Sequence, residues 1–353
     1  MTGSGKIFAA RVVEWQRRAG RQDLPWQGTR DPYRIWLSEI MLQQTQVATV
    51  IPYYRRFLAR FPDVRALASG SVDDVLQLWS GLGYYSRGRN LHLAARVVMQ
   101  RHAGTFPTAR EALEALPGIG RSTAAAISVF SAGAREAILD GNVKRVLARC
   151  FAVAGFPGEA VVQKRLWSLA QSLLPEEGIE PYTQGLMDLG ATLCTRTRPR
   201  CGTCPLAEAC EALKLGKPVH YPAPKPRKAL PHKTTVMLLL VQDGRVLLQK
   251  RPPAGIWGGL WSLPEFDSTS EALESCRARL GIMVESQRTL QPLKHGFTHY
   301  SLTISPLLCV AAARATLAAE PGSAWWAVDE AIQSSIPAPV RTLLRRVGGT
   351  GSS

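Results

Sequence analysis

A proline-rich basic segment divides this 353-residue chain and limits what either side of it can form. Residues 218–233, PVHYPAPKPRKALPHK, contain five prolines, four Lys or Arg residues and no acidic residue. Proline lacks the backbone donor of a helix, and so much charge resists packing into a core. We therefore predict an interdomain linker at 218–233, between a domain at 1–217 and a second domain at 234–353.

The two sides of the linker show different hydrophobic periodicities. Before it, apolar residues recur at spacings of three and four, as in VDDVLQLW and VKRVLARCFAV, which indicates helices. After it, TTVMLLLVQDGRVLLQKR predicts two strands around an Asp-Gly turn, HYSLTISPLLCVA predicts another strand, and SEALESCRARLG between them is helix-like. The predicted fold class is multidomain, with an all-α domain followed by an α+β domain.

The charge is concentrated in the first domain. Of the 43 Lys and Arg and 27 Asp and Glu residues, 28 and 18 fall in 1–217, whereas 11 and 9 fall in 234–353. The formal net charge of +16 favours a polyanionic partner, nucleic acid or an anionic membrane, although charge that serves only solubility is an equal alternative.

Neither a signal peptide nor a membrane span is expected. The apolar stretch near the start is interrupted by Arg11 and Glu14, and the run VMLLLV is too short to cross a bilayer. We predict an intracellular protein that does not contact a membrane.

Four of the seven cysteines lie in one window, CTRTRPRCGTCPLAEAC, with six, two and five residues between them. They are Cys194, Cys201, Cys204 and Cys210. Thiols stay reduced inside cells, which argues against disulfides. A compact set of four ligands favours an iron–sulfur centre at 194–210, and the spacing does not exclude zinc.

The glycine turn in LPGIGRSTAAAI has two possible uses. A nucleotide-binding P-loop requires a lysine before its Ser or Thr, and here Arg121 precedes Ser122. The flanking pattern instead predicts a helix, a turn at Gly118–Gly120 and a second helix, whose positive end and free N–H groups suit a DNA phosphate. An ordinary corner between two helices is the alternative.

Two carboxylates stand in contexts that suit acid–base chemistry. Glu39, in IWLSEIMLQQ, has apolar neighbours that would raise its pKa, and Asp140, in ILDGN, precedes a helix whose N–H groups would keep it ionised. Cleavage of an N-glycosidic bond needs such a proton donor and such an anion. From these residues alone, a solvated Glu39 and a helix-capping Asp140 remain alternatives.

Several of these motifs occur together, in order, in a known family. The segments LPGIGRSTAAAI, ILDGNVKRVLARC, WLSEIMLQQTQV, GLGYYSRGRNL and the cysteine window resemble the helix-hairpin-helix DNA glycosylases that carry an iron–sulfur cluster. With RPPAGIWGGLWSLPEF and HGFTHYSL, the resemblance is to the adenine-specific mismatch DNA glycosylases, the MutY family, over nearly the whole chain.

The resemblance implies roles for individual residues of the first domain. Glu39 would protonate adenine at N7, and Asp140 would stabilise the sugar cation or form a transient adduct with it. Ser122 stands where the related lyases have the lysine that forms a Schiff base, which implies a glycosylase without efficient strand cleavage. Contacts to DNA and the lesion pair are implied for Gln43, Gln44, Tyr84, Gly118, Gly120, Ser122 and Lys144.

The implied ligands are one [4Fe–4S] cluster on Cys194, Cys201, Cys204 and Cys210, and a monovalent or calcium ion at the glycine turn. The implied partner is double-stranded DNA with an adenine mismatch, bound by a monomer inside the cell, in the cytoplasm or nucleoid if the source is bacterial. The sequence does not identify replication or repair partners.

The second domain resembles Nudix domains but lacks their metal-binding glutamates. Gly259 and Glu265 have the spacing that opens a Nudix box, whereas the Glu-Glu positions hold Arg277 and Ala278, or Ala278 and Arg279 one residue later. We predict a recognition module. By resemblance, Phe297, Thr298 and His299 would sense 8-oxoguanine, with threonine where the family has serine.

Two other functions compete with adenine removal. One is a pyrimidine-damage glycosylase and AP lyase of the endonuclease III type, which Ser122 and the second domain oppose. The other is a non-enzymatic iron–sulfur DNA sensor, which the contexts of Glu39 and Asp140 oppose.

Overall fold

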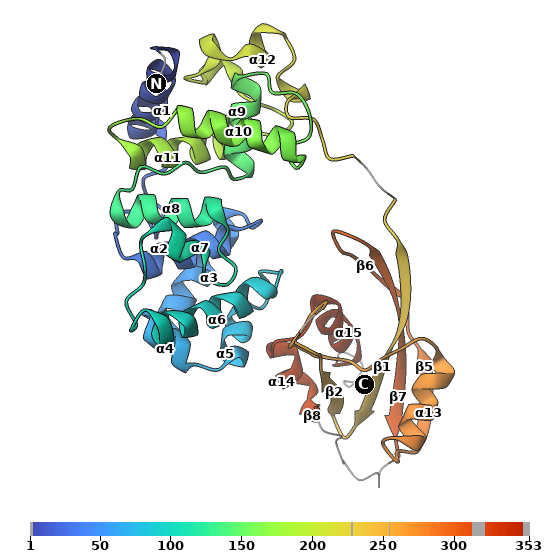
Figure 1. The fold of residues 1–353 in the computed structure, drawn as a ribbon. Helices are drawn as coiled ribbons and strands as arrows, with labels where there is room; N and C mark the ends of the chain where they lie inside the picture. Colours follow the sequence, from blue (N-terminus) through green and yellow to red (C-terminus); the bar gives the residue numbers. More distant parts are fainter. Residues whose placement is uncertain (1–2, 227–228, 254, 313–321, 349–353) are drawn as a thin grey trace. The chain divides into compact units, whose positions relative to one another are not determined.

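A computed structural model describes residues 3–226, 229–253, 255–312 and 322–348 (Figure 1). Contacts divide the chain into two compact units. The helical unit comprises Met1–Ser71 and Arg89–Arg227, and the sheet unit comprises Val72–Gly88 and Lys228–Ser353. The sequence pattern does not predict the grouping of 72–88 with the second unit.

The helical character predicted before the linker is confirmed. The α-helices are α1 (Gly3–Ala19), α2 (Pro32–Leu42), α3 (Val47–Arg60), α4 (Val64–Ser69), α5 (Val72–Trp79), α6 (Ser86–Arg101), α7 (Arg110–Glu114), α8 (Arg121–Ala132), α9 (Gly141–Cys150), α10 (Ala160–Ser172), α11 (Ile179–Asp188) and α12 (Glu211–Lys214). A π-helix, η1 (Leu189–Leu193), extends α11, and 3₁₀ turns lie at Cys201–Thr203, Ala207–Ala209 and Pro218–His220.

Helix α9 shows how the apolar spacing builds the core of the helical unit. Val143, Val146, Leu147 and Cys150 recur at three and four residues, and all four side chains are buried with residues of α1, α10 and α11. The expected helix over VKRVLARCFAV ends at Cys150, because Val153 turns back to donate its backbone N–H to the carbonyl of Ala148 at 2.9 Å.

The strands predicted after the linker are confirmed, in a mixed sheet. Its strands are β1 (His232–Gln242), β2 (Arg245–Lys250), β3 (Trp261–Ser262), β4 (Glu265–Phe266), β5 (Val284–Thr289), β6 (Leu293–Gly296), β7 (Ser301–Ala311) and β8 (Ser323–Ala327). β1 pairs in parallel with β7 and antiparallel with β2. Asp243 and Gly244 both have positive φ angles, as a tight hairpin turn requires. Because His232 already pairs with Ser301, β1 begins inside the predicted linker.

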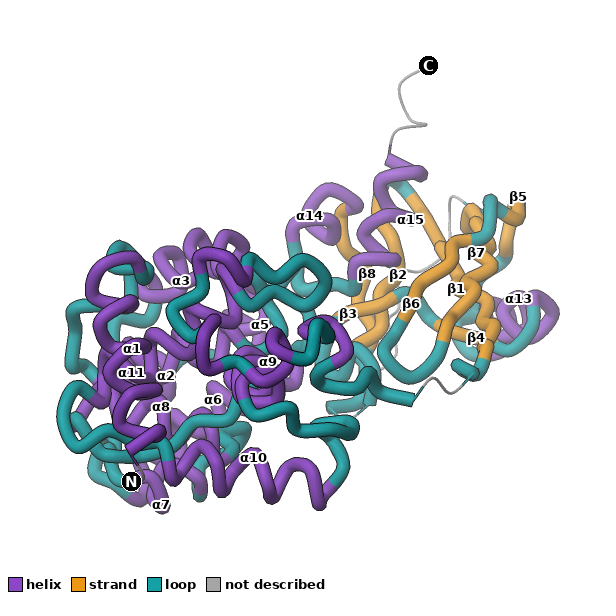
Figure 2. The backbone as a smooth tube through the Cα atoms, turned by 90° about the horizontal axis from the view of Figure 1, so that it is seen from above, coloured by secondary structure: helices purple, strands orange, loops and turns teal. Residues whose placement is uncertain are grey.

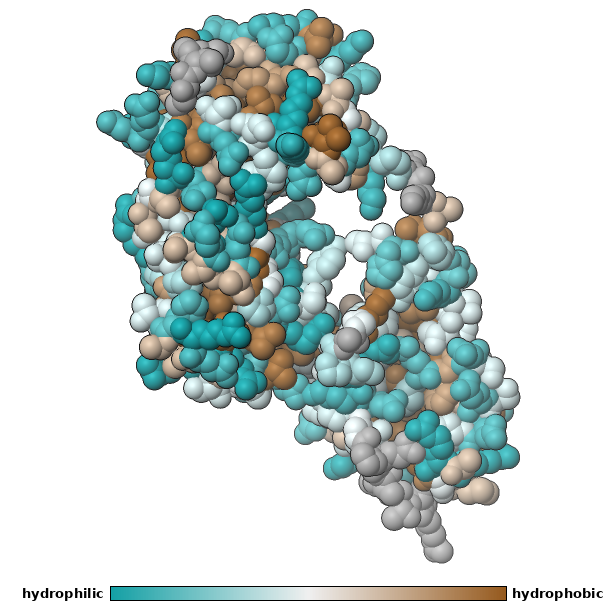
Figure 3. Space-filling view, in the orientation of Figure 1, coloured by the Kyte–Doolittle hydropathy of each residue, from teal (hydrophilic) through white to brown (hydrophobic). Residues whose placement is uncertain are grey.

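Both faces of β1 are covered, which explains its continuous apolar run. Met237 and Leu239 pack against α14 (Val328–Gln333) and α15 (Ala338–Gly348), whereas Leu238 and Leu240 pack against α13 (Thr269–Ala278). Figure 2 shows α13 on the opposite side of the sheet from α14 and α15. The visible face in Figure 3 is mostly hydrophilic, with its hydrophobic side chains in small separate groups.

In the helical unit, the contact between η1 and α9 leaves no room for a side chain at Gly190. Gly190, in η1, is buried against α9, and a Cβ atom there would lie 2.5 Å from Cβ and 2.9 Å from Cα of Asn142. η1 and α9 approach this closely because residue 190 is glycine.

We expect Gly190→Ala to lower the free energy of unfolding by about 1–3 kcal/mol, since the added methyl group must push backbone apart. Chemical denaturation of the full chain measures this. Gly141→Ala is the matched control, because nothing lies within 4 Å of a Cβ there. Equal losses in the two variants would contradict the argument.

Candidate active site

Glu39 is the partly exposed residue in an otherwise buried stretch of α2, from Ile35 to Met41. Asp31 caps this helix by accepting the backbone N–H of Tyr33 at 2.9 Å, and Pro32 occupies its first turn. Trp36, Leu37, Ile40 and Met41 are buried, and the Glu39 side chain is half-buried. Burial, and secondarily the nearby charge of Asp140, raises the pKa of Glu39 to about 8. Glu39 therefore holds a proton at neutral pH.

Asp140 is the N-cap of α9, as a helix-capping reading of the sequence also requires. Its Oδ1 accepts the backbone N–H of Val143 at 2.8 Å. These backbone bonds and the charges of Arg145 and Lys144 lower its pKa, but burial outweighs them, so the net shift is upward. The expected N–H groups are present, and they oppose the upward shift that burial causes in the pKa of Asp140.

The two carboxyl groups face one cavity. The Asp140 cavity is lined by both carboxylates together with Gln43, Gln44, Gly120, Ser122, Thr123 and Asn142. Glu39 also faces a second cavity of about 480 Å³, the Trp26 cavity, whose walls include Leu24, Trp26, Gln27, Ile35, Val47 and Gln184. Glu39, Arg21, Leu42, Val47 and Met187 line both. The site thus joins a proton donor to a pocket of the size and mixed polarity that bind small ring systems.

Ser122 does more than fill the place of an amine. Its Oγ accepts the backbone N–H of Leu139 at 2.9 Å, which ties the start of α8 to the residue before Asp140. Gln43 Nε2 lies 3.4 Å from the Thr123 hydroxyl, so the end of α2 also contacts α8. The first turn of α8 therefore positions both flanks of the Asp140 cavity.

The glycine turn before α8 exposes backbone. Gly118 has a φ of +80°, and a Cβ atom there would lie 2.8 Å from Cβ of Asn90. Ile119 is buried and Gly118 and Gly120 are exposed, so the turn is held by its apolar residue and presents its glycines outward. The N-cap Gly120 supplies no side chain to the free N–H groups of α8. The predicted helix–turn–helix is confirmed.

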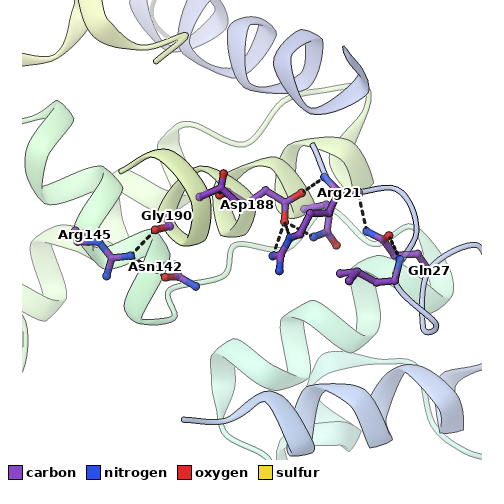
Figure 4. A network of polar contacts seen from close by, with 9 residues as sticks. Arg21, Gln27, Asn142, Arg145, Asp188 and Gly190 are labelled. Atoms are coloured by element: carbon purple, nitrogen blue, oxygen red, sulfur yellow. Dashed lines mark hydrogen bonds and ion pairs between the residues drawn. The ribbon is translucent and has the colours of Figure 1, made fainter. Parts of the chain in front are cut away.

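A polar network connects the cavities to the cysteine region, and the sequence did not reveal it. Asp188, fully buried at the end of α11, accepts the backbone N–H of Arg21 at 2.8 Å, its Nε at 2.7 Å and Gln184 Nε2 at 2.9 Å (Figure 4). Beyond η1, Arg145 on α9 donates to the carbonyls of Gly190 and Cys194, both at 2.7 Å. Arg145 also donates to Asn142 Oδ1 at 2.8 Å, next to the cap of α9.

The four cysteines of the window line a single small apolar cavity with Cys150. Arg149, 2% exposed, donates to Sγ of Cys194 at 3.3 Å and to the carbonyls of Thr195, Arg196 and Tyr221 at 2.7–2.9 Å. Within the described residues, no three His, Cys, Asp or Glu side chains are placed closely enough to hold a metal ion. The donors nevertheless fit a thiolate-bound group, because four half-buried sulfurs share one wall beside a buried cation.

Arg145 and Arg149 are functional candidates that the sequence reading missed. They stand four residues apart on α9, so one helical face carries both toward the residues around Cys194. That spacing was the only available signal. Lys144, the residue before Arg145, is half-buried beside Asp140.

Two predicted lesion contacts have strained backbones. Gln44 has a φ of +57° and is exposed just after α2, and Tyr84, 43% exposed, has a φ of +47°. Non-glycine residues with such angles are uncommon, and they concentrate at functional positions. The structure therefore presents both side chains at turns, consistent with contact to a ligand.

In the sheet unit, the turn after β6 carries the other predicted contacts. Phe297 is half-buried, its N–H donates to the carbonyl of Tyr300 at 2.9 Å, and Thr298 and His299 are exposed at the tip. Glu265 forms an ion pair with Arg251, and Arg277 and Ala278 lie on α13 where Nudix hydrolases require glutamates.

Among the described residues, no helix combines the length and the hydrophobicity that a membrane span requires.

Sequence comparison covers both units. Residues 37–172 match the HhH-GPD superfamily of base excision DNA repair proteins, and residues 235–346 match the NUDIX domain. The chain is 38% identical over 302 residues to the adenine DNA glycosylase of Buchnera aphidicola subsp. Acyrthosiphon pisum, covering 86% of both chains. It is 33% identical to the human adenine DNA glycosylase, covering 96% of this chain and 73% of the human one.

Structural comparison supports the helical fold. A thermostable thymine-DNA glycosylase is 29% identical, with a TM-score of 0.55, and the match covers 60% of this chain and 97% of that one. An endonuclease III bound to DNA has the same fold at 20% identity, with a TM-score of 0.52. Taken with the relatives that match almost end to end, these findings show that the chain belongs to the adenine DNA glycosylases of the MutY family.

Proposed function

We propose that this protein excises adenine mispaired with 8-oxoguanine or guanine by hydrolysing its N-glycosidic bond, as a monofunctional enzyme of base excision repair. The observation that carries the proposal is that Glu39 and Asp140 line one cavity, and that only Asp140 has backbone N–H groups and nearby cations that oppose the upward pKa shift that burial gives both groups. Glu39 has the apolar surroundings of a proton donor, and Asp140 has the N–H groups and cations that support an anion.

The Trp26 cavity receives the extruded adenine. A base must leave the stack before its glycosidic bond is accessible, and pockets for such bases combine a ring-stacking wall with polar edges. Trp26 and Leu24 offer apolar surface, and the amides of Gln27 and Gln184 stand at the polar wall. Glu39 is shared with the neighbouring cavity, so its carboxyl group reaches the purine from the side of the sugar.

The reaction is a proton-assisted departure followed by addition of water. Glu39 gives its proton to N7 of adenine while the bond from the sugar C1′ to N9 breaks and its electron pair stays with the base. Asp140 stabilises the resulting cation or adds to it transiently. Water then attacks C1′ and returns its proton to Glu39, which leaves adenine and an abasic site.

Strand cleavage is not part of this activity. A Schiff base with the opened sugar requires an amine, whereas Ser122 offers a hydroxyl that already accepts the N–H of Leu139. Lys144 lies beside Asp140 and contacts a DNA phosphate. An AP lyase of the endonuclease III type is the second candidate, because an endonuclease III has the same helical fold.

The DNA is held and read by both units. The exposed turn of Gly118 and Gly120, with a monovalent or calcium ion, binds phosphate, and Gln43, Gln44 and Tyr84 contact the lesion pair. Phe297, Thr298 and His299 sense 8-oxoguanine, and the sheet unit does not act as a pyrophosphohydrolase, because Arg277 and Ala278 cannot bind its metal ion. One copy of the chain acts on double-stranded DNA inside the cell.

The cysteine cavity holds a [4Fe–4S] cluster on Cys194, Cys201, Cys204 and Cys210. Such a cluster would cross-link the segments that carry the four cysteines and would take no part in the hydrolysis. Arg149 fixes the backbone between Cys194 and Arg196, so the arginines of TRTRPR project from a held loop. Arg196, Arg198 and Arg200 are then available to phosphates.

Excision by single turnover tests the function. Duplexes carry adenine opposite 8-oxoguanine, adenine opposite thymine, or thymine glycol, each with and without alkali. We expect strand breaks in the first duplex alone and only after alkali. Glu39→Gln should lose at least about a hundredfold in rate and keep DNA binding, since general acid catalysis contributes about that much or more. Alkali-independent breaks at thymine glycol would establish the lyase instead.

The pH dependence follows from the pKa of Glu39. Because the acid form is active and its pKa is about 8, the single-turnover rate should fall as the pH rises above 8. This fall in rate at high pH should be absent from the residual activity of Glu39→Gln. A wild-type rate that is constant from pH 7 to pH 9 would rule out Glu39 as the proton donor.

The same group makes stability depend on pH. The folded protein keeps a proton up to about pH 8 that the unfolded chain loses near pH 4.5, so stability falls as the pH rises through this window. Glu39→Gln removes this loss, and its advantage over wild type should grow between pH 5 and pH 8 by at most about 1.4 kcal/mol per pH unit. Glu14→Gln, at an exposed glutamate of α1, is the control. Parallel profiles for wild type and Glu39→Gln would contradict the argument.

The cluster has a direct chemical test. Purified full-length protein should contain iron and acid-labile sulfide in equal amounts, and Cys204→Ser should lose most of both. Cys276→Ala, at a buried cysteine of α13, should keep them. If the protein instead contains zinc and no sulfide, the four cysteines form a zinc site and the cluster assignment is wrong.

A further inference from the structure

The turn that carries Phe297 packs against a cluster of aromatic rings, which the sequence motifs do not predict. The ring of Trp257 lies 5.2 Å from Phe297 and 5.6 Å from His295, measured between centroids. His295 lies 4.6 Å from Phe297 in an edge-on contact, and Tyr300 lies 4.6 Å from Phe297 on the other side of the turn. Phe297 therefore packs against the rings of Trp257, His295 and Tyr300, with the His299 ring farther away at 6.3 Å, while Thr298 and His299 remain exposed.

Trp257 is held in place by its backbone and by an ion pair. Its φ of +53° is unusual for a bulky residue and needs support from its surroundings. Arg251 donates from Nε to the carbonyl of Ile256 at 3.0 Å, its guanidinium lies 5.7 Å from the Trp257 ring centroid, and it pairs with Glu265. The carbonyl of Trp257 accepts the N–H of Leu260 at 3.0 Å.

The neighbouring glycines are required by the same arrangement. A Cβ atom on Gly258 would lie 2.5 Å from the carbonyl oxygen of Pro253, and Gly259 has a φ of +73° while its N–H donates to Pro252 at 3.0 Å. Residues 257–260 thus form a tight, fully specified turn. These residues, with Glu265, are the ones whose spacing resembles the start of a Nudix box.

We propose that this remnant of the Nudix box is a scaffold for lesion recognition, in which Trp257, fixed by Arg251 and Glu265, positions Phe297 and thereby the tip of Thr298 and His299. The proposal rests on the proposed function, since it assigns lesion reading to that tip. Glu265 occupies a position of the Nudix box, and here it forms an ion pair with Arg251. Trp257 is a positioning residue that acts through Phe297 and sets the preference for 8-oxoguanine over guanine.

The test is the ratio of single-turnover rates with 8-oxoguanine and with guanine opposite adenine, measured on the full chain at subsaturating enzyme. Trp257→Leu should lower this ratio about two- to tenfold, the range that corresponds to one aromatic pair, with little change for guanine. Trp257→Phe should keep most of the preference. If Trp257→Leu unfolds at the assay temperature, Trp257→Met takes its place: methionine is flexible enough to fill part of the gap but has no ring, so this variant should lower the ratio to the same extent.

Trp326→Leu is the matched control. Trp326 belongs to the same apolar cluster, and among the described residues its ring contact is with Trp261, at 5.6 Å, and not with Phe297. We expect this variant to keep the ratio. The double variant Trp257→Leu/Phe297→Ala should have the ratio of Phe297→Ala alone, because Trp257 acts through that ring.

Three results would overturn the inference: an unchanged ratio in both Trp257→Leu and Trp257→Met, an equal loss in Trp326→Leu, or additive losses in the double variant. Each leaves adenine excision intact, so the proposed function would survive. If wild type itself showed no preference for 8-oxoguanine, the lesion-reading function would fail, and this scaffold role with it.

Discussion

The N-terminus of α9 is the point on which the rest of the helical unit depends. Asp140 caps the helix through the N–H of Val143, so the residue that faces the cavity is also the one that starts the helix. One and two turns later, Arg145 and Arg149 reach the residues around Cys194. A single short helix therefore fixes the carboxylate, η1 and the cysteine cavity relative to one another.

Burial then gives two similar carboxyl groups different chemistry. Both pKa values are raised by desolvation, but only Asp140 has backbone donors and two cations to oppose it. Glu39 has apolar neighbours on α2, and the charge of Asp140 raises its pKa further. Two carboxylates that close together do not both ionise easily, so the group with backbone donors and nearby cations is favoured to carry the charge and the other to keep the proton.

The sheet unit is built around one mixed sheet. Its mixed sheet, with α13 on one face and α14 and α15 on the other, matches a Nudix domain, although the metal-binding glutamates are replaced. What remains of the box is a tight turn at Gly258 and Gly259 and an Arg251–Glu265 pair. These features hold Trp257 at a positive φ, a backbone angle that a bulky residue keeps only where its surroundings fix it.

The sequence by itself determined the helices and strands, because these depend on local patterns, whereas the roles of Glu39 and Asp140 came from the resemblance to a known family. The prolines of 218–233 predicted a linker between two domains, and the apolar spacing predicted α9 and β1. The glycines indicated the turn at 118–120, and Asp140 before a helix indicated an N-cap. The tertiary structure alone decided which groups meet. No spacing brings Arg21 to Asp188, Ser122 to Leu139 or Trp257 to Phe297, since each pair is separated by at least 17 residues and joined only when separate helices or strands pack. It also decided the sign of the Asp140 shift, because the balance between hydrogen bonds and desolvation is a property of the buried site and not of the residues next to it.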